Sequence, residues 1–214
     1  MIPTAAATGR ARVRPTNRSW SQDQWWTWDD GAVAMLPPRF VGGGMKFSDL
    51  MKVPYDTSTG IIRVASLCSM LPQTPEEVAQ QFYADHGRKG DFQRLYSGLR
   101  IDRLAWTLIS EQGRRIANPS MNQDFRPWFE SVSNRAAGVR ASGWTCVDSR
   151  PRIVDHWQHH LTWIAPPIFL AGTTMGVSAE FHLVEGHTRL GLLSGLLREG
   201  LVPMESEHRL WLGR

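Results

Sequence analysis

The chain has 214 residues, of which 42 % are hydrophobic and 21 % charged, a composition far from that of a disordered protein. No stretch approaches the roughly 18 uninterrupted apolar residues that a membrane-spanning helix needs, and the N-terminus lacks the apolar core of a secretory signal. The two cysteines, Cys68 and Cys146, form no CxxC pair, so neither a disulfide framework nor a thiolate zinc site is indicated. We therefore expect a globular, cytoplasmic protein without a membrane partner.

The net charge of +4 lies at one end of the chain. Residues 1–18 contain four arginines and no acidic residue, so the rest of the chain balances 20 basic against 20 acidic residues. Global charge is therefore weak support for nucleic-acid binding. Two interpretations of the tail stay open, a flexible lead-in and an arm that contacts a polyanion.

Residues 1–44 are interpreted as an arginine- and tryptophan-rich extension that is partly flexible. Four of the ten tryptophans lie between Trp20 and Trp28, and such a concentration of apolar surface requires a partner. That partner is either the body of this chain or a second molecule, a protein or a nucleic acid. Two prolines at 37–38 and three glycines at 42–44 are typical of a linker that ends the extension.

Residues 45–143 are predicted to be mainly helical. Thr74 as N-cap, Pro75 at the first helical position and Glu77 in a capping box predict a helix that runs to Gly87. Apolar residues at helical spacing predict three further helices, over residues 91–99, 101–116 and 125–137.

Residues 144–214 predict a small mixed-sheet domain, which makes the fold class α+β. The expected elements are a short helix at 150–157, strands at 166–170 and 180–184, a leucine-rich helix at 190–197, and closing strands at 201–203 and 209–212. A sharp turn is expected at Gly186, and Gly200 suits the end of the leucine-rich helix.

The turn between the second of these strands and the leucine-rich helix predicts a phosphate-binding loop. A strand that passes directly into a helix leaves several backbone N–H groups at the helix start without internal partners. Gly186 permits a sharp turn, Thr188 adds a hydroxyl, and Arg189 supplies a planar guanidinium suited to phosphate oxygens. From the residues alone one alternative stays open: Thr188 caps the helix, and Arg189 pairs with Glu185 on the surface.

The same region resembles the ParB/sulfiredoxin superfamily over about residues 150–212. The resemblance is carried by Pro166 and Pro167 before a strand, a second strand, the segment Glu-Gly-His-Thr-Arg-Leu at 185–190, a leucine-rich helix and a closing strand. Members of the superfamily bind nucleotides with a Gly-x-x-Arg loop and its helix: partition proteins use CTP, sulfiredoxins use ATP, and a serine kinase branch uses ADP. The resemblance implies a nucleotide, with or without Mg²⁺, bound at Gly186, His187, Thr188 and Arg189.

His187 departs from two family patterns. It stands where partition proteins have the glutamate associated with CTP hydrolysis, and where sulfiredoxins have the cysteine that reduces sulfinic acids. The resemblance therefore implies neither activity for this chain. Arg189 is the residue that carries over from the family pattern.

Glu185 and His187 are the candidate catalytic residues. Glu185 is expected to bind a magnesium ion or act as a base, and His187 to transfer a proton or contact phosphate near pH 7. The alternative is that Glu185 orients Arg189 and that His187 bonds to the neighbouring backbone. Arg150 and Arg152 are candidates to reach the same anion, although surface solvation explains them equally well.

Three histidines near residue 160 have the spacing of helical zinc ligands, but no metal site is assigned to them. His156, His159 and His160 place two imidazoles on one helical face. No third ligand is fixed by the sequence, and no HExxH motif is present.

Three functions remain in competition. The first is a nucleotide-dependent enzyme or switch, with hydrolysis, phosphoryl transfer or switching at the 185–190 loop. The second is a ParB-like nuclease that acts on DNA or RNA. The third is a non-catalytic module whose N-terminal extension recruits a protein or nucleic acid, in a mobile-element or antiviral setting.

Overall fold

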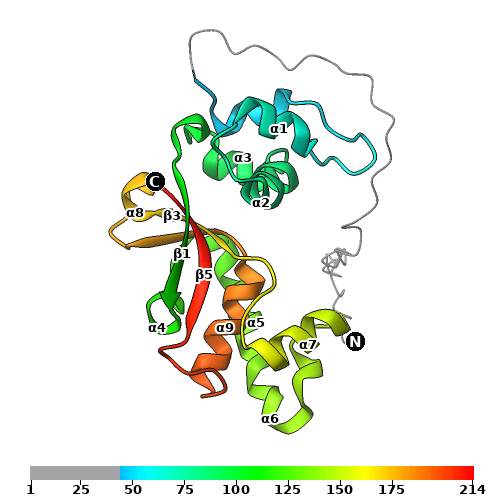
Figure 1. The fold of residues 1–214 in the computed structure, drawn as a ribbon, viewed down its shortest axis with the longest axis vertical. Helices are drawn as coiled ribbons and strands as arrows, with labels where there is room; N and C mark the ends of the chain where they lie inside the picture. Colours follow the sequence, from blue (N-terminus) through cyan, green and yellow to red (C-terminus); the bar gives the residue numbers. More distant parts are fainter. Residues whose placement is uncertain (1–43) are drawn as a thin grey trace, which may run out of the picture. The chain divides into compact units, whose positions relative to one another are not determined.

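The computed structural model describes residues 44–214, which lie within one compact unit, Pro37–Arg214. The expectations for the arginine-rich tail and for the tryptophans at 20–28 lie outside the described residues. Within the described part the fold is α+β, as the sequence predicted, with helices on both faces of a mixed sheet (Figure 1).

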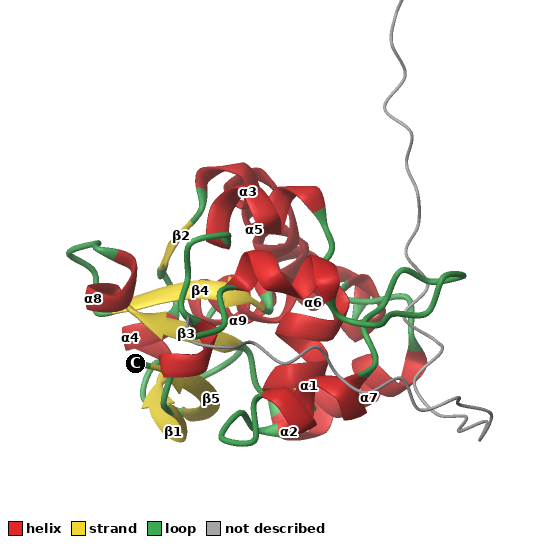
Figure 2. Cartoon of the chain, turned by 90° about the horizontal axis from the view of Figure 1, so that it is seen from above, coloured by secondary structure: helices red, strands yellow, loops and turns green. Residues whose placement is uncertain are grey.

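Five strands of the described residues form one sheet in the order β1-β5-β3-β4-β2. Their bounds are β1 (Trp106–Gln112), β2 (Ser120–Met121), β3 (Ile168–Ala171), β4 (Phe181–Glu185) and β5 (Glu207–Gly213). β5 pairs antiparallel with the whole of β1 and parallel with β3, whereas β4 pairs antiparallel with β3 and parallel with β2. Figure 2 shows the strands gathered together with the longer helices beside them.

Helices cover the sheet as two groups. One group contains α5 (Arg126–Arg135), α7 (Pro151–His160) and α9 (His187–Arg198). The other contains η1 (Phe47–Lys52), α1 (Val64–Met70), α2 (Glu76–Val78), the π-helical turn η2 (Ala79–Ala84) and α3 (Gly90–Tyr96). Short turns complete the fold: η3 (Ile101–Arg103), α4 (Gly113–Ile116), η4 (Gln123–Phe125), η5 (Ala136–Gly138), α6 (Val139–Ser142), η6 (Trp144–Cys146) and α8 (Gly172–Met175).

Two hydrophobic cores lie on opposite faces of the sheet, because successive side chains of a strand point to opposite sides. In β3, Ile168 and Leu170 belong to the core with the N-terminal helices, whereas Phe169 belongs to the core with α5 and α9. In β5, Leu212 lies with Phe169, and Trp211 packs on the opposite side. The sheet is therefore a shared wall between the two helical groups.

Two glycines allow α9 to approach α5 closely. A Cβ atom on Gly191 would stand 2.8 Å from the carbonyl oxygen of Phe129, and one on Gly195 would collide with the backbone of Ser133. Any larger residue at these positions forces the helices apart, so this contact fixes the position of α9 and of its N-terminal end.

Most of the local predictions are confirmed. Helices occupy the regions expected at 75–87, 91–99, 125–137, 150–157 and 190–197, and strands occupy those expected at 166–170, 180–184 and 209–212. Thr74, however, makes no cap: its hydroxyl is buried without a hydrogen-bond partner, and Pro75 is the N-cap of α2. No strand forms at residues 201–203.

The helix predicted at 101–116 is wrong, because residues Trp106–Gln112 form strand β1. Trp106 packs with the N-terminal helices and Ile109 with the core around α9, so the apolar residues of this segment serve both faces of the sheet. Its backbone bonds to β5, a partner about 100 residues later that no local periodicity reveals. The sheet consequently takes strands from both sides of the boundary expected at residue 143.

Among residues 44–214, none of the helices combines the length and the apolar character that crossing a bilayer requires.

Candidate functional site at the N-terminal end of α9

A tight turn at Gly186 joins β4 to α9. Gly186 has φ +99°, a left-handed conformation that favours glycine. Its Cα faces Pro167, and an added Cβ would stand 3.0 Å from the Cα atom of that proline. The turn predicted from the sequence is therefore held by backbone conformation and by close packing against Pro167.

The first turn of α9 has three backbone amides without an acceptor among the described residues. The first bond within the helix runs from the amide of Leu190 to the carbonyl oxygen of Gly186, at 2.9 Å. The amides of His187, Thr188 and Arg189 precede it, and no described side chain caps this helix. These donors lie at the positive end of the dipole of a 12-residue helix, so the turn carries a positive potential.

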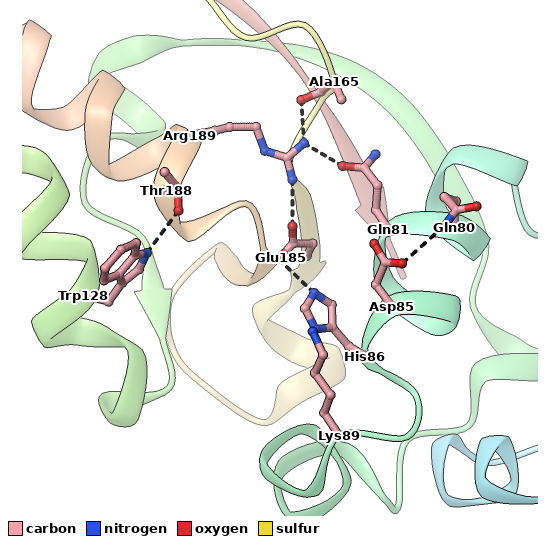
Figure 3. A network of polar contacts seen from close by, with 10 residues as sticks. All are labelled: Gln80, Gln81, Asp85, His86, Lys89, Trp128, Ala165, Glu185, Thr188 and Arg189. Carbon is pink, nitrogen blue, oxygen red and sulfur yellow. Dashed lines mark hydrogen bonds and ion pairs between the residues drawn. The ribbon is translucent and has the colours of Figure 1, made fainter. Parts of the chain in front are cut away.

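The Arg189 guanidinium is held by three acceptors (Figure 3). Its Nη1 donates to Gln81 Oε1 at 2.6 Å and to the carbonyl oxygen of Ala165 at 2.8 Å, and its Nη2 donates to Glu185 Oε1 at 2.9 Å. The side chain is 21 % exposed, and burial lowers its pKa. Of the alternatives that the sequence left open for Arg189, the pair with Glu185 is the one present, although both side chains are mostly buried.

Glu185 belongs to a longer polar chain that reaches the helical region. Its Oε2 lies 3.4 Å from Nε2 of His86, whose Nδ1 lies 3.2 Å from Nζ of Lys89. The His86 ring stacks on Phe92, with centroids 4.0 Å apart, which fixes the imidazole plane. Burial acts to raise the pKa of Glu185, but the His86 hydrogen bond and the charges of His86 and Arg189 hold it well below its usual range.

Three more polar groups are buried around this series of polar contacts. Burial raises the pKa of Asp85 to about 6, and Gln80 Nε2 donates to this carboxyl group at 3.3 Å. Burial lowers the pKa of His187 to about 4, and its Nε2 has no hydrogen-bond partner. The Tyr96 hydroxyl is also without a partner, and burial, with the Glu185 charge, raises its pKa. Buried titratable groups with shifted pKa values are typical of functional sites.

Thr188 is bonded to α5 rather than to its own helix. Trp128 Nε1 donates to Thr188 Oγ1 at 3.0 Å, so this hydroxyl is an acceptor for the indole and does not cap α9 (Figure 3). A hydroxyl that accepts one bond still has its own hydrogen to donate. Thr188 therefore remains able to contact a further acceptor at the same turn.

The structure separates Arg150 and Arg152, the two arginines that were candidates to reach the same anion. Arg150 forms bonds with both carboxylate oxygens of Asp148, at 2.9 and 2.7 Å, and its positive charge lowers the pKa of Arg189, an effect secondary to burial. Arg152 is exposed on α7, where its charge acts on His156. Arg150 thus lies within electrostatic reach of the loop, and no such influence on Arg189 is seen for Arg152.

The five contiguous residues 185–189 come together at the site, but the residues that surround them were not predicted. Gln81 comes from η2, Asp85 and His86 come from the two helical residues that follow it, and Trp128 comes from α5. The sequence did place the first three on one helix, but nothing in their spacing connects them to a loop 100 residues away. π-Helical turns are uncommon and often lie at functional sites, which offers a signal only once the structure is known.

The histidine group on α7 does not assemble into a metal site with a third ligand. The rings of His156 and His160 lie 4.5 Å apart, and His159 pairs with Asp155 at 3.2 Å. Within residues 44–214 no group of three or more histidine, cysteine, aspartate or glutamate side chains is placed to hold a metal ion.

No protein-family model, no curated protein and no solved structure matches this chain.

Proposed function

We propose that the N-terminal end of α9 binds the phosphates of a nucleotide. The observation that carries this proposal is the set of three backbone amides without acceptors at His187, Thr188 and Arg189. Helix N-termini of this kind are ready-made anion sites, because donors and helix dipole favour the same charge. The resemblance of the strand, Gly-x-x-Arg turn and leucine-rich helix to the ParB/sulfiredoxin superfamily supports a nucleotide as the source of that anion.

Arg189 fits the proposal as a fixed donor beside the amides. A guanidinium has five N–H groups, and the bonds to Gln81, Ala165 and Glu185 use three, leaving two for ligand oxygens. The three acceptors hold the side chain in one place, so binding costs little side-chain entropy. Glu185 offsets part of the positive charge, which makes the amides as important as Arg189 for affinity.

Nearby arginines add positive potential to the same region. Arg150 acts on Arg189. Burial acts to raise the pKa of Asp148, but the hydrogen bonds and charge of Arg150, with the charge of Arg135, together lower it. Arg150 and Arg189 therefore repel each other near the start of α9. A polyanion such as a di- or triphosphate would relieve their mutual repulsion.

The chemistry that follows binding is hydrolysis, phosphoryl transfer or switching. Both Glu185 oxygens are engaged, so this residue would orient Arg189 and His86 in the resting site, and any role as a base would require one contact to open. Burial lowers the pKa of His187 to about 4, so the imidazole stays neutral and its buried Nε2 is a weak base near pH 7. Magnesium would bind together with the phosphates, as it commonly does in nucleotide sites, and would not need a site made only of protein ligands.

Binding is tested by thermal shift and calorimetry on the full chain with ATP, ADP and CTP, each with and without Mg²⁺. A nucleotide at 100 times its dissociation constant stabilises the folded state by about 2.7 kcal/mol, which raises the melting temperature by roughly 5 to 10 °C. Arg189→Lys keeps the charge but not the planar donor pattern, and we expect it to weaken binding by about 10- to 100-fold. Arg152→Ala is the matched control, with no change expected.

Absence of any shift with nucleotide or inorganic tripolyphosphate would refute the proposal. The nuclease alternative makes a different prediction: cleavage of single- or double-stranded DNA or RNA with Mg²⁺ or Mn²⁺, lost in Arg189→Lys. Cleavage without nucleotide binding would indicate that the site binds a nucleic-acid phosphodiester and not a free nucleotide.

A further inference from the structure

Trp128 is the most exposed of the large hydrophobic side chains in the described residues. It is 50 % exposed, compared with 46 % for Met51 and Met204. An exposed indole leaves apolar ring surface in water, so a ligand that covers the ring gains free energy by burying that surface. Trp128 belongs to neither of the two cores.

Two contacts fix the Trp128 ring beside the first turn of α9. Its Nε1 donates to Thr188 Oγ1 at 3.0 Å, and the guanidinium of Arg135 lies over the ring, with its carbon 5.4 Å from the ring centroid. Figure 3 shows Trp128 reaching Thr188 from α5, while the side chain of the next residue, Arg189, turns toward Gln81. The ring is thus held beside one of the three amides that lack an acceptor.

We propose that Trp128 is the platform on which the base of the bound nucleotide stacks. This inference rests on the proposed phosphate site, and it adds the place where the base of the nucleotide binds. An ordered, half-exposed indole offers a flat apolar surface of the kind on which nucleobases stack. One sugar joins base to phosphate in a nucleotide, so base and phosphate contacts must lie close together, as Trp128 and the amide of Thr188 do.

The hydrogen bond between Trp128 and Thr188 also couples the base contact to the phosphate contact. The Thr188 hydroxyl accepts from the indole and has one hydrogen left for a phosphate oxygen, so a single side chain links base platform and phosphate site. Arg135 contributes a cation–π contact to the ring. Stacking on any base is tolerant of sequence, so the platform selects nucleotides as a class and not one particular base.

The test measures binding of two ligands by calorimetry on the full chain: inorganic tripolyphosphate, and whichever of ATP, ADP or CTP binds best. We expect Trp128→Leu to weaken nucleotide binding by about 5- to 150-fold while tripolyphosphate binding changes by less than about 2-fold. Trp128→Phe keeps a ring but loses the bond to Thr188, and is expected to give an intermediate loss of nucleotide affinity. Thr188→Val removes the hydrogen bond to Trp128 but keeps the indole. It therefore distinguishes the effect of this bond from the effect of stacking.

Tyr55→Leu is the matched control. Tyr55 is 37 % exposed and has the guanidinium of Arg88 3.6 Å above its ring, so it reproduces the environment of Trp128 outside the α9 turn. Nucleotide affinity should not change in this variant. Circular dichroism checks that each variant is folded, and Trp128→Phe provides the result if Trp128→Leu is not.

The outcomes separate the two proposals. If wild type binds nucleotide and Trp128→Leu binds it equally well, the platform is refuted and the phosphate site stands. If Trp128→Leu loses tripolyphosphate and nucleotide equally, the ring only supports Thr188, and the platform is again refuted. If wild type binds neither ligand, the phosphate site itself fails, and the platform fails with it.

Discussion

Asp85→Asn should stabilise the protein above pH 6 and leave it unchanged near pH 4. Burial is the main reason that the pKa of Asp85 is raised from 3.8 to about 6, with the negative charge of Glu185 adding to the effect and His86 opposing it. A raised folded-state pKa means that neutral Asp85 stabilises the fold below about pH 4, and that this contribution is lost as pH rises through about 6. A difference of roughly two pKa units corresponds to about 3 kcal/mol.

The variant retains the oxygen that accepts from Gln80, but it cannot ionise. Urea unfolding of wild type and variant at pH 4, 5, 6, 7 and 8 should show a difference that grows from near zero to on the order of 3 kcal/mol and then levels off. The corresponding gain in melting temperature at pH 8 is roughly 6 to 12 °C. Taking the difference between the two proteins cancels the titration of every group they share.

Asp91→Asn is the control, because the Asp91 side chain is 75 % exposed and its removal should change stability by less than about 0.5 kcal/mol at every pH. Two results would refute the reasoning: a difference for Asp85→Asn that does not depend on pH, or a variant less stable than wild type at pH 8. Either would mean that water reaches Asp85 or that its charge has a partner strong enough to offset burial.

Gly195→Ala should destabilise the fold by about 2 kcal/mol or more in urea unfolding, since its Cβ would enter the α5 backbone, whereas Gly90→Ala, in open space, should stabilise by about 0.5 to 1 kcal/mol. Because burial lowers the pKa of His187 to about 4, wild type should lose about 3 kcal/mol relative to His187→Gln as pH falls from 7 to 4; parallel pH profiles would contradict this. Gln81→Leu removes an acceptor of Arg189 and should weaken nucleotide binding by about 5- to 20-fold in calorimetry; an unchanged affinity would show that Arg189 needs no positioning from η2.

Elements whose signals are local could be predicted from the sequence. The leucine spacing of α9 and the glycine before it specify a helix and a turn within a dozen residues, and both are present. Residues 185–189 form a contiguous group for the same reason. The strand, the turn and the helix are formed by consecutive residues. The proximity of residues 185–189 can therefore be predicted without knowledge of the rest of the fold.

Features that depend on partners distant in sequence were missed. The apolar residues of β1 have spacing compatible with a helix, and only the pairing with β5 decides for a strand. The cluster of His86, Asp85 and Gln81 around Glu185 and Arg189 requires η2 to pack beside β4, which composition and periodicity cannot specify. Trp128 resembled one more apolar residue of a helix, and its position beside Thr188 follows from the close contact of α5 with α9.

Because both helical groups pack against the same sheet, truncating this chain has a practical consequence. A fragment that starts near residue 144 would keep β3, β4, α9 and β5 but lose β1, which leaves one side of β5 with exposed hydrogen-bonding groups. It would also lose the helices that cover Ile168 and Leu170, each fully buried in the intact protein. Such a fragment is expected to associate with itself through its unpaired strand edge and its uncovered sheet face, so assays belong on the 214-residue chain.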